Sequence, residues 1–248
     1  MAVTFRVPDM ALAYEFLEGA GPVVVFCPGF ASDMGGTKAM ALWEMCRARG
    51  QAMLRFDYGG HGQSAGAFED GCIGDWAADA AHVVEMATMG RELLLVGSSM
   101  GGWIALLLAR ALAQVRALVL VAPAPDFTEL LMKPQLGEAE WAELRAKGVI
   151  YQPSEYGAPT PLTLKLLEDG ARNLVLEAPI GFNGPVRVLH GMRDADVPWR
   201  HCLLLAERLA SEDVRLVFVK DGDHRLSRAA DLALLCASVG AFLGEDGG

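Results

Sequence analysis

The stretch LLLVGSSMGGW, residues 93–103, decides the fold of this chain. Residues 92–96 are apolar apart from the first and predict a buried strand, and residues 100–113 predict a helix. Between them Gly97, Ser99 and Gly101 fit the pattern G-x-S-x-G, in which a sharp strand-to-helix turn presents the central serine. Ser99 is therefore the candidate nucleophile, and Ser98 takes the variable position. This stretch alone leaves open a glycine-rich turn with idle serines.

Strand-like runs alternate with helix-like stretches along the rest of the chain. Further strands are expected at residues 3–7, 13–17, 23–27, 52–56, 116–121, 186–190 and 214–219, and further helices at residues 37–49, 74–89, 199–210 and 227–243. Such alternation predicts right-handed strand–helix–strand units and a parallel sheet with helices on both faces. We therefore predict an α/β fold with a mostly parallel eight-stranded sheet, in a single domain spanning residues 1–248.

The alternation stops between Asp126 and Gly184. This part of the chain has amphipathic helical pieces and no strong strand, and it contains Pro134, Pro153, Pro159, Pro161 and Pro179. We expect an insertion of about residues 126–184 that forms a short helical lid over the sheet. Four of its apolar side chains could line an acyl pocket or pack into the core, namely Met132, Leu136, Trp141 and Leu144.

Composition and charge exclude several classes of protein. The net charge of −10 argues against a nucleic-acid-binding protein, which usually carries a basic face. The five cysteines form no C-x-x-C pair, so we expect reduced thiols without disulfides or zinc, in the cytoplasm. We recognise no signal peptide, and no apolar run reaches the roughly 18 residues of a membrane span. The glycine-rich loop at residues 55–62 lacks a nucleotide-binding pattern and is expected to be structural.

A serine nucleophile needs a base, and the chain has five histidines. Where G-x-S-x-G lies on a strand-to-helix turn, the acid and then the histidine follow the serine in the chain, which leaves His201 and His224. His201 lies at the start of an expected helix and is predicted to be a surface residue. His224 lies in the polar loop KDGDHR after the strand at residues 214–219, where a base belongs. His224 is the candidate base, and a solvated loop histidine is the alternative.

The acid that orients the base is expected in the loop after residues 186–190. This loop offers Asp194 and Asp196. We assign Asp194 as the acid and keep Asp196 as the alternative, since Asp196 is better placed to cap the helix that follows. Stabilising an oxyanion requires two backbone N–H donors, and Met100 and Phe30 provide them in the loops after the serine and after residues 23–27.

Several motifs together resemble the α/β-hydrolase superfamily: GSSMGGW, RFDYGGHG, FCPGFASDMGGTKA, PVRVLHGMRDADVPW and GDHR. More narrowly, they are similar to the abhydrolase-domain branch of palmitoyl-protein thioesterases and acyl-glucuronide esterases. The resemblance implies a serine hydrolase of ester or thioester bonds that uses no metal and no cofactor. It carries the catalytic roles onto Ser99, Asp194 and His224, with Phe30 and Met100 as oxyanion donors. A mitochondrial presequence is not recognised here.

The sequence therefore predicts a cytoplasmic serine esterase or thioesterase that acts on small acyl substrates through an acyl-enzyme. A peptidase or a carbon–carbon bond hydrolase would use the same three residues. A small-molecule-binding protein that retains the fold but turns over poorly is an alternative of another class, although a binder has no need of all three groups.

Overall fold

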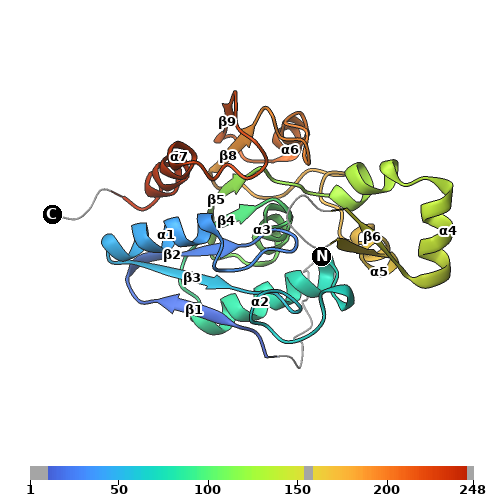
Figure 1. The fold of residues 1–248 in the computed structure, drawn as a ribbon. Helices are drawn as coiled ribbons and strands as arrows, with labels where there is room; N and C mark the ends of the chain where they lie inside the picture. Colours follow the sequence, from blue (N-terminus) through green and yellow to red (C-terminus); the bar gives the residue numbers. More distant parts are fainter. Residues whose placement is uncertain (1–10, 154–158, 245–248) are drawn as a thin grey trace.

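The computed structural model describes residues 11–153 and 159–244, in which seven strands form one sheet (Figure 1). These strands are β1 (Tyr14–Leu17), β2 (Ala20–Cys27), β3 (Gln51–Phe56), β4 (Leu93–Ser98), β5 (Val115–Val121), β8 (Val186–Gly191) and β9 (Val214–Val219). Their order is β1-β3-β2-β4-β5-β8-β9, and every neighbouring pair is parallel except β1 with β3. The predicted fold class, α/β with a mostly parallel sheet, is confirmed.

Helices cover both faces of this sheet (Figure 1). They are α1 (Thr37–Ala48), α2 (Ile73–Thr88), α3 (Met100–Ala111), α6 (His201–Arg208) and α7 (Ala229–Gly240). In β2, Val23 and Val25 pack in the core shared with α2, α3 and α6, whereas Val24 and Phe26 pack in the core shared with α1 and α7. Both faces of the strand are buried, which explains why the central strands are continuous apolar runs.

Two predictions about strands need comment. The eighth strand, expected at residues 3–7, lies outside the described residues. The prediction of no strong strand within residues 126–184 is wrong, because β6 (Val149–Gln152) and β7 (Thr160–Thr163) form an antiparallel pair. Pro161 lies in β7 opposite Tyr151. A two-stranded sheet has only edge strands, where the missing N–H of a proline is tolerated, so the prolines here did not exclude a strand.

The other regular elements described between β5 and β8 are helical. They comprise a π-helical turn (Thr128–Met132), a 3₁₀ turn (Lys133–Gln135), α4 (Glu138–Lys147) and α5 (Leu164–Gly170). Leu144 of α4 is fully buried, while Met132, Leu136 and Trp141 are half-buried against the main core. None of the described helices combines the length and the apolar composition that a membrane span requires.

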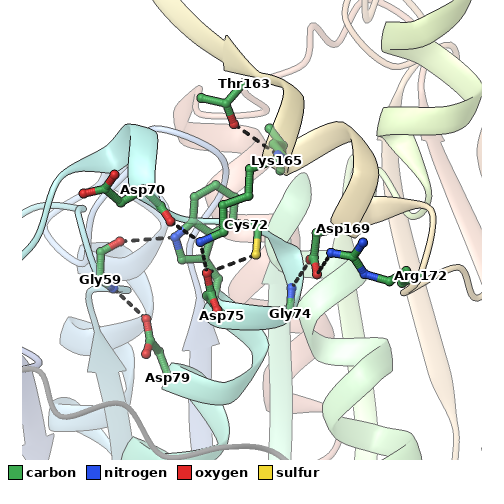
Figure 2. A network of polar contacts seen from close by, with 12 residues as sticks. Gly59, Asp70, Cys72, Gly74, Asp75, Asp79, Thr163, Lys165, Asp169 and Arg172 are labelled. Carbon is green, nitrogen blue, oxygen red and sulfur yellow. Dashed lines mark hydrogen bonds and ion pairs between the residues drawn. The ribbon is translucent and has the colours of Figure 1, made fainter. Parts of the chain in front are cut away.

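Polar contacts fix α5 onto the first turn of α2 (Figure 2). Lys165 Nζ lies 2.7 Å from Asp75 Oδ2, and the Gly74 amide donates to Asp169 Oδ2 at 2.7 Å. The Lys165–Asp75 pair is about half exposed and contributes no more than about 1 kcal/mol. Asp169 is buried, so its bond to the Gly74 backbone is the firmer of the two attachments.

Asp126 joins the beginning of this segment to its end. Its buried carboxylate accepts hydrogen bonds from the backbone N–H groups of Val175 at 2.9 Å and Leu176 at 2.8 Å. Burial raises the pKa of this carboxyl above its usual range, and the two backbone donors oppose the increase. The chain that leaves β5 and the chain that returns to β8 are thus held together beside the sheet.

The strand order reverses between two particular loops. After β2 the chain adds β3 on one side, and it then returns to add β4 on the other side of β2. In open α/β sheets, ligands bind at the carboxyl ends of the strands where the order reverses in this way. The loop after β2 contains Phe30 and the turn after β4 contains Ser99, so the topology brings these two predicted site residues to the same point.

Candidate active site

Ser99 forms the turn between β4 and α3. Its backbone has φ 54° and ψ −120°, which is a strained conformation for a residue with a side chain. The Ser99 N–H donates to the Val121 carbonyl at 2.9 Å, and the Ser99 carbonyl accepts from Gly102 at 2.8 Å and Ala124 at 3.1 Å. Backbone bonds on both sides therefore hold the strained turn in place, as expected where strain belongs to a functional site.

The glycines that flank Ser99 are required by close backbone contacts. A Cβ built on Gly101 would lie 2.0 Å from the Cys27 carbonyl oxygen, and one built on Gly97 would lie 2.3 Å from the Gly101 carbonyl oxygen. Neither position has room for a methyl group. The pattern G-x-S-x-G is thus explained by the tight packing of β4, α3 and the end of β2.

His224 lies between Ser99 and Asp194. Its Nε2 is 3.0 Å from Ser99 Oγ, and its Nδ1 is 2.7 Å from Asp194 Oδ2. The side chain of His224 is 18% exposed, so it reaches the crevice from a largely covered position. In the adjoining loop, the Leu226 amide donates to Asp223 Oδ1 at 3.0 Å and Lys38 Nζ donates to the Arg225 carbonyl at 2.6 Å.

The carboxylate of Asp194 is fully buried. Its Oδ1 accepts from the Asp196 and Val197 amides at 2.9 and 2.8 Å, and its Oδ2 faces His224. Burial by itself would raise the pKa of Asp194, but hydrogen bonding by His190 and His224 holds it well below the usual range. Asp194 is therefore an anion at neutral pH, which fixes the Nδ1–H tautomer of His224.

Two interpretations made from the sequence are wrong. Asp196 does not cap the next helix, because α6 begins at His201 with Arg200 in the capping position and has no side-chain cap. His201 is not a surface residue: it is 8% exposed, and its Nε2 lies 2.7 Å from the Pro125 carbonyl oxygen. Burial lowers the pKa of His201, so this imidazole is neutral at pH 7 and occupied by a structural hydrogen bond.

The two predicted oxyanion donors lie in the turn of Ser99 and in the loop that passes beside it. Met100 is the first residue of α3, so its N–H has no partner within the helix. Phe30 follows Gly29, on which a Cβ would lie 3.4 Å from Ser99 Cβ. Among the described residues, neither amide donates to a protein group. Both donors are available, in a loop and a turn that meet at the serine.

Aromatic side chains pack around Phe30. Its ring makes edge contacts with Phe68, Trp76 and Phe127, with centroid distances of 4.9, 5.9 and 5.8 Å. A cavity of about 200 Å³ lies between the loop after β2 and the loop after β3, and it is lined by Asp33, His61 and Phe68, among others. Trp76 and Phe127 are buried, so their rings support the side chain of Phe30 from the core.

The loop after β3 is structural, as its sequence predicts. Asp57 is buried, and its carboxylate accepts from the Met34 amide at 2.7 Å and the Gln63 amide at 2.8 Å. His61 is buried among Tyr58, Phe68 and Trp76, and burial lowers its pKa. These contacts join the loop after β3 to the loop that carries Phe30.

Asp194, Asp196 and His224 make up a cluster whose ligand-type atoms lie within 4.8 Å of one another in the described part of the chain. Oxygen and imidazole ligands suit several divalent metals. However, Asp194 Oδ2 and His224 Nδ1 already face each other at 2.7 Å, and a metal ion would have to replace that hydrogen bond.

His190 is the site residue that the sequence reasoning missed. It is fully buried at the end of β8, and its Nε2 lies 3.2 Å from Asp194 Oδ2. In the sequence it is the last residue of VRVLH, which predicts a strand and gives no sign of a site residue. The available signal was a titratable side chain at the carboxyl end of a buried strand, four residues before the candidate acid.

Comparison with known proteins identifies the family. The model of the family described as "Serine aminopeptidase, S33" matches residues 20–152. The human protein named palmitoyl-protein thioesterase ABHD10, mitochondrial, is 38% identical over 236 residues, which cover 94% of this chain and 76% of the human protein. This chain is an α/β hydrolase.

Solved structures agree with this assignment. The hydrolase superposes on a crystal structure of a protein from Agrobacterium vitis S4 with a TM-score of 0.92 and 41% identity, covering 98% of both chains. It superposes on mouse alpha/beta hydrolase domain-containing protein 10 with a TM-score of 0.86 and 34% identity, again covering 98% of both chains. The resemblance stated from the motifs is confirmed, and it extends over nearly the whole hydrolase.

Proposed function

We propose that this hydrolase cleaves carboxylic ester and thioester bonds of acyl substrates, with Ser99 as nucleophile, His224 as base and Asp194 as the acid that orients His224. The observation that carries the proposal is the continuous hydrogen-bonded series from Ser99 Oγ through His224 to Asp194, at 3.0 and 2.7 Å. The strained turn at Ser99 supports it independently, and the low pKa of Asp194 follows in part from the same hydrogen bond to His224.

In this mechanism His224 Nε2 takes the proton of Ser99 as the serine oxygen attacks the acyl carbonyl carbon. The carbonyl oxygen becomes an oxyanion, and the amides of Met100 and Phe30 donate to it. His224 then gives its proton to the departing alcohol or thiol, and the acyl group stays on Ser99. Water, deprotonated by His224, releases the acid and restores the serine.

A fatty acyl thioester is the substrate class we favour. The curated relatives that match this chain are named palmitoyl-protein thioesterases. The side chain of Phe30, held by the rings of Phe68, Trp76 and Phe127, gives the loop of one proposed oxyanion donor an apolar surface, which suits a hydrocarbon chain.

We further propose that residues 126–184 cover the crevice as a lid within one domain. Asp126 closes the base of this segment, Asp169 attaches α5 to α2, and the buried Leu144 holds α4 on the core. The cytoplasmic location expected from the cysteine pattern stays a prediction, and the relatives carry "mitochondrial" in their names.

A fluorophosphonate probe, which reacts with activated serines, tests the nucleophile. The wild-type protein should be labelled, and Ser99→Ala should lose both labelling and hydrolysis. Ser98→Ala is the matched control, because it removes the neighbouring hydroxyl and should retain labelling. Labelling that survives in Ser99→Ala would overturn the assignment.

Paired amide variants test the acid. Asp194→Asn should lower kcat by about 10⁴-fold, since an amide at this position favours the wrong tautomer of the base. Asp196→Asn should leave kcat nearly unchanged. The reverse order of effects would transfer the role of the acid to Asp196.

A substrate panel tests the acyl group and the bond. It contains p-nitrophenyl esters of increasing chain length, palmitoyl-CoA, an acyl glucuronide and an amino-acid p-nitroanilide. The proposal expects the highest kcat/KM for long-chain esters and for palmitoyl-CoA. Activity confined to short esters would refute the fatty acyl assignment, and preferential cleavage of the anilide would favour the peptidase that the family description names.

A further inference from the structure

We propose that His190 is a positioning residue, which donates its Nε2–H to Asp194 and thereby sets the basicity of His224. This inference rests on the proposed function, since it concerns the same three side chains. It assigns a role to a buried histidine that does not contact the substrate.

The protonation of His190 follows from its partners. Its Nε2 lies 2.9 Å from the Val197 carbonyl oxygen and 3.2 Å from Asp194 Oδ2. A carbonyl oxygen can only accept, so Nε2 must carry the hydrogen, and this one N–H lies within reach of both oxygens. His190 Nδ1 is buried without a hydrogen-bond partner in the described structure. A hydrogen on Nδ1 would have no acceptor in the described structure, so the geometry places the hydrogen of His190 on Nε2.

Each carboxylate oxygen of Asp194 therefore faces at least two N–H groups. The Asp196 and Val197 amides bind Oδ1, while His190 and His224 both face Oδ2. The oxygen that accepts the hydrogen bond of His224 Nδ1–H therefore also lies 3.2 Å from the Nε2 of a second imidazole. A donor on this oxygen draws negative charge away from the bond to His224 and fixes the plane of the carboxylate.

Other ionisable groups surround this pair, and the test must leave them unchanged. They are Asp196 in the loop of Asp194, His201 and Cys202 in α6, Asp223 and Arg225 beside His224, and Lys38 in α1. Substitution at His190 alters none of their side chains.

Removing the donor has a predictable direction. Without the His190 N–H, Asp194 Oδ2 keeps more negative charge toward His224 and stabilises its protonated form. The acid limb of the kcat/KM profile, which reports protonation of the base in the free enzyme, should then move to higher pH. A purely structural histidine would lower stability or kcat without moving this limb.

The experiment compares His190→Leu with His190→Gln. Leucine matches the volume of the imidazole but has no N–H, whereas the glutamine amide can place an N–H near the original Nε2. We expect His190→Leu to lower kcat/KM about 10-fold and to raise the acid limb by about half a pH unit or more. His190→Gln should keep the limb within experimental error of wild type.

Thermal unfolding of each variant accompanies the kinetics. Should His190→Leu not fold, His190→Asn replaces it, because the shorter amide does not reach the Nε2 position. The proposal is overturned if the acid limb of the kcat/KM profile does not move in a folded variant that lacks the donor. It is also overturned if His190→Gln shifts the acid limb as much as that variant does. Loss of probe labelling in Ser99→Ala with an unmoved limb in His190→Leu refutes only the role of His190. Hydrolysis that persists in Ser99→Ala refutes the proposed function itself.

Discussion

Replacing Gly101 by alanine tests whether the contact between α3 and the loop after β2 controls catalysis. The new Cβ would lie 2.0 Å from the Cys27 carbonyl oxygen and 2.5 Å from the Pro28 carbonyl oxygen. Both oxygens are backbone atoms, so no side chain can rotate away. Either α3 or the loop that carries Phe30 must move.

The size of this movement sets the expected effect. Carbon atoms of side chains do not approach backbone oxygens closer than about 3 Å, so the displacement is about 1 Å, and a misplacement of that size costs about 100-fold in rate. Loss of one oxyanion donor gives a similar value, roughly 3 kcal/mol. We therefore expect kcat on a p-nitrophenyl ester to fall by 10²- to 10³-fold in Gly101→Ala.

The assay measures kcat, probe labelling and thermal unfolding on the same preparations. Gly181→Ala is the matched control, because a Cβ at Gly181 would meet nothing within 4 Å. It should behave like the wild type. A folded Gly101→Ala protein with kcat within about threefold of wild type would refute the argument that this contact sets the geometry of the donors.

Two further predictions concern pH and thiol chemistry. The pKa of Asp194 is lower in the folded protein than the value of about 3.9 in an unfolded chain, so its ionised form stabilises the fold above about pH 4 and this contribution is lost as the pH falls below that value. The difference in unfolding free energy between wild type and Asp194→Asn, from urea titrations at pH 7 and pH 3, should therefore shrink at pH 3; a constant difference contradicts the assignment of a low pKa. Burial raises the pKa of Cys27, Cys46, Cys72 and Cys202 to about 12, so these thiols should react with Ellman's reagent at pH 8 only after unfolding, and Cys236 should react first in the native protein. Rapid reaction of all five native thiols would show that these side chains are accessible.

Local sequence patterns predicted most of the main sheet. The strand at residues 214–219 was predicted with the bounds of β9, and the apolar runs that became β2, β4 and β5 were placed within two or three residues at each end. The residues predicted for β2, β4 and β5 are almost all buried, so each of these strands is a continuous apolar run, whereas β9 at the edge of the sheet is partly exposed. The order of Ser99, Asp194 and His224 followed from the turn chemistry around Ser99 and from loops that end neighbouring strands.

Features that depend on contacts between residues far apart in the chain could not be predicted from local sequence patterns. The burial of His201 depends on the Pro125 carbonyl, 76 residues earlier in the chain. The pairing of β6 with β7 depends on the packing of short edge strands, whose prolines suggested a loop. His190 looked like the end of a strand because only the folded loop brings Asp194 back to its Nε2.

The register of β2 and β4 fixes where the loops that contain Phe30 and Met100 begin. Cys27 pairs with Gly97, so the two loops that supply Phe30 and Met100 start from the same rung of the sheet. Adjacent strands lie about 4.8 Å apart, so this rung sets where the two loops begin. The segment after β5 also reaches the turn, because the Ala124 amide donates to the Ser99 carbonyl and the Phe127 ring contacts Phe30. A segment exchanged between β5 and β8 would therefore have to keep its first residues, up to Phe127, if the proposed oxyanion site is to stay as it is.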